Sequence, residues 1–546
     1  MRKTVLTVAV VGSLAVGGLA AGSQALATPT TNDRTAAPAA AAKLPPPTPI
    51  DWGPCSDPDL NDAGAQCGFL IVPLDWANPT GAKIKIAVSK VDHTSSNYQG
   101  IMLVNPGGPG GSGVGLATLG QYVPNGAGDD YDWIGFDPRG VGESVPHISC
   151  IPDYFAGPRP EYIPSTVKLE KTWLKRSQAY ATACAKNGPI LNHMTTADVA
   201  RDMDYLRAAL GQKQLNYFGF SYGTYLGEVY STLFPNHVRR MVWDSTVDPR
   251  GVWYGDNLKQ DVAFERTENL WFDWVAKYNN VYHLGTSGPE VRALWYQVKQ
   301  QLTRNPAGGV VGPDEWTDIF LYAGYYQSTW TEFGDLFAKW VHNHDLALLL
   351  NEYEYWVGPS DDNSFAWYLG VQCTDTQWPK SWDKIRLDNW RTYADGPFET
   401  WGNAWFNAPC QYWPAKAHKP IDIDGSKTAN VSVLMIDETL DAATPYPGSL
   451  YVRSIYPGAR LIAERGGTTH AGTLYGNECV DGQIADYLAN GTLPARASGY
   501  TADAYCKPLP QPVPTGANAK VATAGAGSAH AAKTVRGLPL AALPAR

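Results

Sequence analysis

Residues 215–224 read Leu-Asn-Tyr-Phe-Gly-Phe-Ser-Tyr-Gly-Thr, and they specify the architecture of this chain. The apolar run Leu215–Phe218 is typical of a buried strand, and the run Thr224–Leu233 is typical of a helix. Between them lies Gly219-Phe220-Ser221-Tyr222-Gly223, a G-x-S-x-G motif. A serine between a strand and a helix sits on a sharp turn that holds its hydroxyl above the sheet. The segment therefore predicts an α/β sheet with Ser221 as a nucleophile.

The two glycines of the motif have a steric role. Side chains at Gly219 and Gly223 would collide with neighbouring backbone in so tight a turn, and glycine removes the clash. Ser221 would also lie at the N-terminus of the following helix, where free N–H groups and the helix dipole stabilise negative charge. An ordinary glycine-rich turn with a solvated serine is the alternative, and the flanking strand and helix disfavour it.

Strands and helices continue in both directions from this motif. Thr195 or Thr196 is suited to cap a helix that Gly211 ends, just before the strand at Leu215. Most of the other apolar runs are short, which favours buried parallel strands in a doubly wound sheet. The first two predicted strands along the chain, Phe69–Leu74 and Ile84–Val91, alternate apolar and polar residues, which favours an antiparallel pair at the edge of the sheet. The further predicted strands are Phe69–Leu74, Ile84–Val91, Ile101–Val104, Trp133–Phe136, Val238–Trp243, Val431–Ile436 and Arg460–Ala463.

Residues 248–428 interrupt this alternation of strands and helices. The region holds 15 of the 20 tryptophans, and its helical segments have no strand partners. Strand-like segments resume directly after it. We therefore predict an α/β-hydrolase fold with an inserted, mainly helical cap between core segments 49–247 and 429–507. A separate aromatic-rich module, for example one that binds carbohydrate, is the alternative.

The two ends of the chain differ from the core in composition. A short positive region precedes an apolar stretch, and Ala25-Leu26-Ala27 forms an A-x-A cleavage site. Residues 1–27 therefore predict a secretory signal peptide rather than a retained membrane anchor. Residues 28–48 predict a linker or pro-segment, and residues 508–546 predict a disordered tail. We expect a secreted, extracellular protein without membrane contact after cleavage.

Composition and cysteine content narrow the class of protein. An apolar fraction of 44% supports a folded core, and a net charge of −9 without basic runs disfavours nucleic-acid binding. An even number of cysteines in an exported chain predicts disulfides, and the absence of a C-x-x-C pair disfavours a zinc-binding site. Proximity along the chain favours the pairs Cys55–Cys67, Cys150–Cys184, Cys373–Cys410 and Cys479–Cys506.

A serine hydroxyl needs a base to remove its proton, and α/β-hydrolases place an acid and then a histidine after the serine. Asp441 lies just beyond the strand Val431–Ile436, at the sheet edge where the acid is expected. Asp437 is the close alternative, and Asp244 and Asp248 are weaker ones.

The base is chosen by position. His470 and His530 are the histidines that follow Asp441, and His530 lies in the predicted tail. His470 follows the strand Arg460–Ala463 and a glycine-containing loop, which places it at the same sheet edge. A lone surface histidine is the alternative interpretation.

An oxyanion hole needs two backbone N–H groups that point at one position. Tyr222 N–H, directly after the nucleophile, supplies one. The glycine-rich loop 105–113 follows the strand Ile101–Val104, and Gly108 is the predicted second donor. The loop lacks a Gly-Lys-Ser/Thr ending and opens no helix with G-x-G-x-x-G, so a phosphate-binding loop is disfavoured.

These motifs together resemble those of the proline iminopeptidases and the secreted tripeptidyl aminopeptidases of actinobacteria. Residues 106–111 (PGGPGG) resemble the His-Gly-Gly-Pro-Gly loop of the iminopeptidases, and 137–144 (DPRGVGES) match their Asp-x-Arg-Gly-x-Gly-x-Ser segment. Residues 219–227 (GFSYGTYLG) and 441–445 (DAATP) resemble the tripeptidyl branch. The resemblance extends over about residues 49–507. Pro106 stands where the iminopeptidases carry histidine, which favours the tripeptidyl branch.

The resemblance implies a secreted serine exopeptidase that releases short peptides, typically tripeptides, from free N-termini of proteins through an acyl-enzyme. This chemistry requires no metal or organic cofactor. The resemblance also implies a carboxylate that binds the substrate ammonium. Asp375, Glu143 and Glu228 are candidates, although each could instead be solvated or structural. An esterase or lipase on the same fold, and a hydrolase-like binding protein without activity, are the alternative functions.

Overall fold

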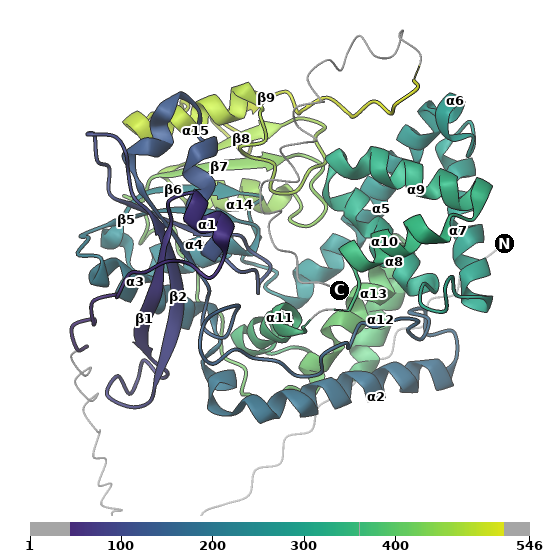
Figure 1. The fold of residues 1–546 in the computed structure, drawn as a ribbon, viewed down its shortest axis with the longest axis horizontal. Helices are drawn as coiled ribbons and strands as arrows, with labels where there is room; N and C mark the ends of the chain where they lie inside the picture. The colour runs from purple at the N-terminus through teal and green to yellow at the C-terminus, as the bar shows by residue number, and fades with distance from the viewer. Residues whose placement is uncertain (1–43, 360, 518–546) are drawn as a thin grey trace, which may run out of the picture. The chain divides into compact units, whose positions relative to one another are not determined.

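The computed structural model describes residues 44–359 and 361–517 (Figure 1). The predicted signal peptide (1–27), residues 28–43 of the predicted linker, and residues 518–546 of the predicted tail lie outside the described residues. Within the described ranges, no helix combines the length and the apolar character needed to cross a bilayer.

A mostly parallel sheet lies at the centre of the fold, as predicted. Within the described residues it has nine strands in the order β1-β2-β4-β3-β5-β6-β7-β8-β9. The pairs β1–β2 and β2–β4 are antiparallel, and the remaining pairs are parallel. The strands are β1 (Gln66–Pro73), β2 (Lys83–Val91), β3 (Ile101–Asn105), β4 (Asp132–Phe136), β5 (Leu215–Phe220), β6 (Val238–Asp244), β7 (Val433–Glu438), β8 (Ala459–Glu464) and β9 (Ala504–Cys506).

Strand β9 is the strand that the sequence pattern missed. It has three residues, too few for a recognisable alternation, and it joins the edge of the sheet beside β8. The disulfide Cys479–Cys506 ties its last residue to the first turn of the preceding helix α15 (Glu478–Asn490). Because a cross-link and a neighbouring strand hold it, β9 needs little intrinsic strand preference.

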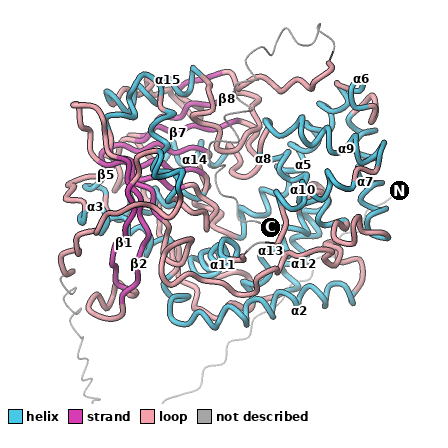
Figure 2. Tube along the Cα trace, in the orientation of Figure 1, coloured by secondary structure: helices cyan, strands magenta, loops and turns pink. Residues whose placement is uncertain are grey.

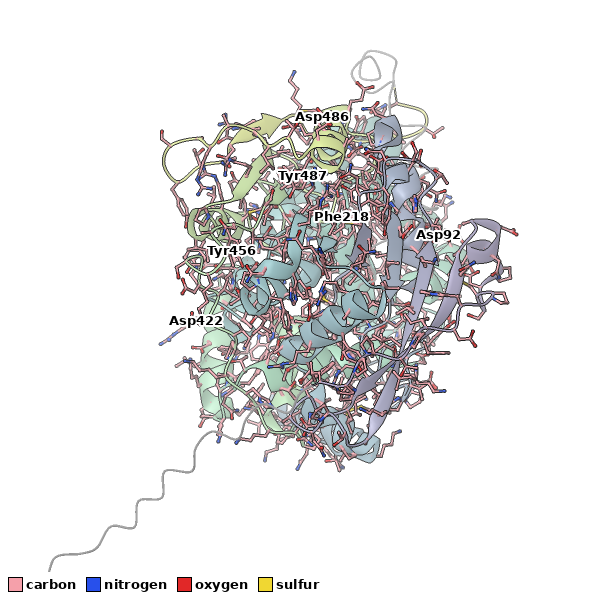
Figure 3. The ribbon with its side chains drawn as sticks, turned by 90° about the vertical axis from the view of Figure 1, so that its left-hand side faces the viewer. Asp92, Phe218, Asp422, Tyr456, Asp486 and Tyr487 are labelled. Atoms are coloured by element: carbon pink, nitrogen blue, oxygen red, sulfur yellow. A yellow bond between two sulfur atoms is a disulfide. The ribbon has the colours of Figure 1, made fainter. Side chains whose placement is uncertain are left out.

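Helices cover both faces of the sheet, as its alternating side chains require. Leu103 belongs to one apolar cluster and its neighbour Val104 to the opposite one. The helices α3 (Thr196–Ala209), α4 (Tyr222–Leu233) and α14 (Pro447–Ile455) pack on the first face, and η1 (Val114–Tyr122) and α15 (Glu478–Asn490) on the second. Figure 3 shows Phe218 of β5 and Tyr487 of α15 in this interior. The sheet is therefore doubly wound.

Helix α3 illustrates how local signals set an element. The Thr195 hydroxyl accepts a hydrogen bond from Asp198 N at 3.1 Å, which caps the first turn. Gly211 adopts φ 69° just beyond the last turn, a conformation that favours glycine. Both features match the prediction from sequence.

Between β6 and β7 the described residues form helices and contribute no strand to the sheet, as predicted (Figure 2). Tryptophan side chains fill the space between these helices. The fully buried ones include Trp271, Trp295, Trp316 and Trp330. Burial of these rings explains the high tryptophan content without a separate carbohydrate-binding module. The helices are α5 (Tyr254–Lys277), α6 (Asn279–Tyr282), α7 (Gly288–Arg304), α8 (Pro313–Tyr325), α9 (Trp330–Asn343), α10 (Leu346–Trp356), α11 (Asn363–Asp375), α12 (Trp382–Tyr393) and α13 (Thr400–Asn407).

Two segments outside residues 248–428 also pack against this cap. Trp173 of α2 (Val167–Cys184) stacks on Trp405 of α13, with ring centroids 5.7 Å apart. The Pro512 carbonyl accepts a hydrogen bond from the Trp274 indole at 3.0 Å, and Val513 packs on the same apolar cluster. The expectation of disorder from residue 508 onward therefore differs from the structure over residues 508–517. Contacts with a distant segment order these residues, and composition does not reveal such contacts.

Four disulfides and a buried ion-pair group fasten the layers. The bonds join Cys55 to Cys67, Cys150 to Cys184, Cys373 to Cys410 and Cys479 to Cys506, the pairs that sequence proximity favours. Arg159 contacts Glu315 at 2.7 Å and Asp318 at 2.8 Å, and all three side chains are buried. These contacts hold the segment before α2 against α8. The remaining helical elements are α1 (Pro58–Asp62), η2 (Pro124–Asp130), η3 (Ala185–His193), η4 (Pro235–His237), η5 (Gln327–Thr329) and η6 (Ala408–Gln411).

Candidate active site

Ser221 occupies a strained turn between β5 and α4, with φ 55° and ψ −125°. A Cβ at Gly219 would lie 2.5 Å from the carbonyl oxygen of Gly223, and a Cβ at Gly223 would lie 2.8 Å from that of Asn105. Both glycines are therefore required by close backbone approach. Ser221 N donates to the carbonyl of Asp244 at 2.9 Å, which anchors the turn to β6. Strain of this kind costs about 1–3 kcal/mol and is typical of functional sites.

Asp441 and His470 form a buried pair at the ends of β7 and β8. The carboxylate oxygen Oδ2 of Asp441 lies 2.8 Å from Nδ1 of His470, and the two side chains are 0% and 1% exposed. Nε2 of His470 is buried and has no hydrogen-bond partner among the described residues. A carboxylate at Nδ1 favours the tautomer in which Nε2 can accept a proton. The pair therefore has the geometry of an oriented general base.

Three backbone and hydroxyl groups saturate the carboxylate of Asp441. Ala443 N donates to Oδ1 at 2.8 Å, and Thr444 N donates to the same oxygen at 3.1 Å. The Thr444 hydroxyl donates to Oδ2 at 3.0 Å and lies 3.4 Å from Nδ1 of His470. Sequence reasoning did not assign Thr444 a role, although the Asp-x-x-Thr-Pro spacing places its hydroxyl one helical turn from the acid.

The alternative acids have other partners. Asp437 accepts a hydrogen bond from the Ser449 hydroxyl of α14, and burial raises the pKa of Asp437 well above its ordinary value. Asp244 accepts from the backbone N and the hydroxyl of Thr473 at 2.9 and 2.7 Å. Asp248 forms ion pairs on the cap side of the site. Of the four candidates, Asp441 is the carboxylate that contacts His470.

The His470 loop is held by both the sheet and the cap. His470 N donates to the carbonyl of Tyr325 in α8 at 2.8 Å, and Ala471 N donates to the Ser245 hydroxyl at 2.8 Å. Asp244 accepts hydrogen bonds from Thr473, which lies three residues after His470 in the same loop. Burial raises the pKa of Asp244 to about 6. The imidazole position therefore depends on cap packing as well as on β8.

The glycine-rich loop lies directly against the serine turn. A Cβ on Gly107 would lie 2.8 Å from Cβ of Ser221 and 3.2 Å from N of Tyr222. Gly107 and Gly108 adopt φ 97° and 106°, which other residues rarely adopt. Tyr222 begins α4, so its N–H has no acceptor within the helix. These positions suit the predicted donors at Gly108 and Tyr222.

Asp137, the first residue of the Asp-x-Arg-Gly-x-Gly-x-Ser segment (137–144), binds the glycine-rich loop. Its Oδ1 accepts from the Ser112 hydroxyl at 2.6 Å, Gly113 N at 2.9 Å and Val114 N at 3.2 Å. These bonds fix the C-terminal end of the glycine-rich loop. Through Asp137, the segment therefore holds the loop that carries the proposed oxyanion donor. The spacing of its residues alone does not reveal this role.

A cavity of about 620 Å³ lies between the sheet edge and the cap. Ser221, Tyr222 and Gly108 line it from the core side, and Tyr325 and Phe406 line it from the cap side. This size falls within the range typical of small-ligand pockets. The charged residues that line it within the described chain are Asp248, Arg250, Asp256, Lys259 and Arg266.

None of the three carboxylates predicted to bind substrate lines this cavity. Asp375 accepts from Thr196 N at 2.8 Å and from the Trp253 indole at 3.3 Å, and burial raises its pKa to about 7. Glu228 is fully buried within α4, and burial raises its pKa well above the ordinary value. Glu143 is exposed. These three carboxylates are therefore not placed to bind a substrate amine in this cavity, because packing of distant helices decides which carboxylates line it.

Comparisons with known proteins agree with this geometry. Residues 100–368 match the family model of the alpha/beta hydrolase fold, and residues 396–506 match that of TAP-like proteins. A tripeptidyl aminopeptidase from Streptomyces lividans is 41% identical over 479 residues, which cover 85% of this chain and 88% of that protein. The serine protease Hip1 from Mycobacterium tuberculosis is 30% identical over 482 residues, 82% of this chain and 90% of that protein. Carboxylesterase B from the same organism is 30% identical over 457 residues, with coverages of 79% and 85%.

Proposed function

Because this chain belongs to the α/β-hydrolase family that includes the tripeptidyl aminopeptidases of Streptomyces, we propose that it is a secreted serine aminopeptidase. Its substrates are the free N-termini of peptides and proteins, from which it releases short peptides, typically tripeptides. The observation that carries the proposal is the buried Asp441–His470 pair beside a cavity that contains Ser221. Four disulfides support export to an oxidising compartment.

The reaction proceeds through an acyl-enzyme. Nε2 of His470 removes the Ser221 proton while Oγ attacks the carbonyl carbon of the scissile bond. The N–H groups of Tyr222 and Gly108 stabilise the oxyanion, and His470 then protonates the departing amine. Water attacks the acyl-enzyme with His470 again as base, which regenerates the serine. Asp441 keeps the imidazole oriented and stabilises its charged form.

The enclosing cap supports an exopeptidase rather than an endopeptidase. Helices α5, α8, α11 and α13 supply most of the cavity wall opposite the sheet edge. We infer that this wall limits how far a substrate can extend on the cap side of the scissile bond, as an exopeptidase requires.

The N-terminus of the substrate provides the decisive experiment. We expect tripeptide p-nitroanilides with a free amine to be cleaved at least about 100-fold faster than their N-acetylated forms, measured as kcat/KM. Mass spectrometry of digests of longer peptides should show released tripeptides. Equal rates for free and blocked substrates would contradict the aminopeptidase proposal and favour an endopeptidase or esterase.

Ester hydrolysis is the second candidate, because a relative of similar coverage carries the name carboxylesterase. A serine, histidine and acid arranged in this way cleave esters and amides alike. Comparison of p-nitrophenyl esters with tripeptide p-nitroanilides separates the two functions. A high kcat/KM for acyl esters with no turnover of any peptide amide would favour the esterase.

A further inference from the structure

We propose that Asp256 binds the α-ammonium group of the substrate, an inference that rests on the aminopeptidase function proposed above. Asp256 lies in the first turn of α5 and lines the cavity that contains Ser221. Its oxygen Oδ2 is buried and has no hydrogen-bond partner among the described residues. A buried carboxylate oxygen without a donor is costly in the empty protein, and an ammonium group would satisfy it.

The chain between the serine turn and Asp256 is connected by a packed aromatic pair. Trp253, at the start of α5, packs on Tyr222 with ring centroids 5.8 Å apart, and Tyr222 directly follows Ser221. Asp256 N donates to the carbonyl of Trp253 at 3.2 Å, so Asp256 lies one helical turn further along. The indole of Trp253 thus connects the serine turn to the first turn of α5.

The dimensions of a tripeptide fit this arrangement. In an extended chain, the amine of a tripeptide lies at most about 10 Å from its last carbonyl carbon. A cavity of about 620 Å³ that contains both Ser221 and Asp256 can hold this span. The position of the carboxylate would then determine how many residues lie between the amine and the cleaved bond.

The neighbouring charges distinguish Asp256 from Asp248, the other carboxylate that lines the cavity within the described chain. Both oxygens of Asp248 accept hydrogen bonds: Oδ1 from Nε of Arg250 at 2.8 Å, and Oδ2 from Nη2 of Arg250 at 2.8 Å and from Lys259 at 2.9 Å. Asp256 contacts Lys259 at 3.0 Å through Oδ1, and its buried Oδ2 has no partner among the described residues.

The ionisation of Asp256 supports ligand binding. Burial raises the pKa of Asp256 to about 7, so the charged form is poorly stabilised in the empty protein. The Lys259 side chain is 48% exposed, and solvent therefore weakens its attraction for Asp256. A substrate ammonium enclosed in the cavity would be screened less than this lysine and would favour the charged carboxylate.

Asp256→Asn tests the assignment, since it keeps the shape of the side chain and removes its charge. We expect the ratio of kcat/KM for a free tripeptide p-nitroanilide to that for its N-acetylated form to fall by about 30- to 100-fold. The loss should appear mainly as a higher KM for the free substrate. Asp383→Asn in α12 is the matched control, because the Asp383 side chain is 83% exposed and does not line the cavity, and it should keep the wild-type ratio.

The conservative variant separates a charge role from a structural role. Asp256→Glu restores the carboxylate, and we expect it to recover at least about a tenth of the wild-type ratio. Titration with a fluorophosphonate counts the intact active sites in each preparation, and Asp256→Ser replaces the Asn variant if that variant does not fold. An unchanged ratio in Asp256→Asn, or an equal loss with free and acetylated substrates, would overturn the assignment. A wild-type enzyme without any preference for the free amine would instead overturn the proposed function itself.

Discussion

The sheet edge and the cap each hold a carboxylate at or beside the cavity that Ser221 lines, and the hydrogen bonds of the two carboxylates differ. At the sheet edge, Asp441 receives hydrogen bonds from Ala443 N, Thr444 N and the Thr444 hydroxyl, in addition to its contact with His470. In the cap, Asp256 keeps one buried oxygen without a partner among the described residues. A carboxylate whose oxygens all have partners holds a neighbouring group in place, whereas a carboxylate with an unpartnered oxygen can bind a ligand.

This contrast reflects how the two regions are built. Parallel strands end at a common edge, so the loops after β5, β7 and β8 meet there. The cap wall is formed by helices that are far apart in sequence, and their packing decides which side chains face the cavity. The sheet edge therefore supplies the chemistry, and the cap supplies the recognition of the substrate.

The largest expected effect is at the sheet edge. Ser221→Ala removes the nucleophile, and we expect kcat to fall by about 10⁵- to 10⁶-fold, as in other serine hydrolases of this type. Fluorophosphonate labelling should disappear, while the urea midpoint of unfolding should not decrease, because the Ser221 hydroxyl caps no helix N–H and its removal costs no such hydrogen bond. Residual peptidase activity above about 1% in the purified variant would refute Ser221 as the nucleophile.

Substitutions of two neighbouring acids, Asp441 and Asp437, test which of them is the catalytic acid at the sheet edge. Asp441→Asn should lower kcat by about 10⁴-fold, because the amide favours the wrong histidine tautomer. Asp437→Asn is the matched control, since Asp437 contacts Ser449 instead of His470, and we expect it to lower kcat less than about tenfold. Rates of tripeptide p-nitroanilide cleavage measure both. The reverse order of effects would identify Asp437 as the acid.

The next prediction asks whether cap and sheet unfold together. Trp405 is buried, stacks on Trp173 and Trp382, and donates its indole N–H to the carbonyl of Tyr162 at 2.6 Å. Trp405→Ala should lower the free energy of unfolding by about 3–5 kcal/mol in urea titrations. Trp390→Ala, at a site that is 38% exposed, should cost clearly less.

One cooperative transition is expected for Trp405→Ala, because the cap contacts the sheet edge directly: His470 N donates to Tyr325 of α8, and Trp253 packs on Tyr222. A second transition at low urea, with fluorophosphonate labelling of Ser221 retained, would show instead that the cap melts independently of the sheet.

The smallest effect concerns the pH dependence of stability. Burial, and then the charge of Asp244, raise the pKa of Glu464 to about 8 from its ordinary value of 4.5. The folded state therefore favours the protonated form, and this stabilisation is complete below about pH 4.5 and is lost as the pH rises toward 8. Glu464→Gln mimics the neutral form. We expect its free energy of unfolding to decline less between pH 5 and 8, by about 2 kcal/mol, than that of the wild type.

Urea titrations across this pH range measure the effect. Glu478→Gln, at an exposed position in the first turn of α15, should keep the wild-type slope. An identical decline in Glu464→Gln and the wild type would show that Glu464 is not protonated in the folded protein.

Local signals account for the features that the sequence predicted well. The turn at Ser221 is encoded by adjacent residues, since both glycines act within two positions of the serine. The caps of α3 and the apolar period of the parallel strands are equally local. The Asp441–His470 contact spans 29 residues, but the order of strands already brings both loops to one edge.

The carboxylates predicted from the sequence to bind substrate show the limit of reasoning from local sequence. Glu228 lies two helical turns after Ser221 along α4, yet its side chain is buried in the apolar interior. Asp375 faces Thr196 and Trp253 rather than the cavity. Burial of a side chain depends on which other elements pack against it, and chain proximity carries no information about that.

The amino-acid sequence by itself determined the α/β architecture, the serine turn and the order of the catalytic candidates, because each depends on neighbouring residues or on the common edge of parallel strands. The tertiary structure alone decided that α2 and residues 508–517 pack on the cap, and that Asp256 faces the cavity. The physical reason is that close packing of distant helices sets the environment of a charge, and the same carboxylate can be saturated, buried without a partner or solvated depending on those neighbours.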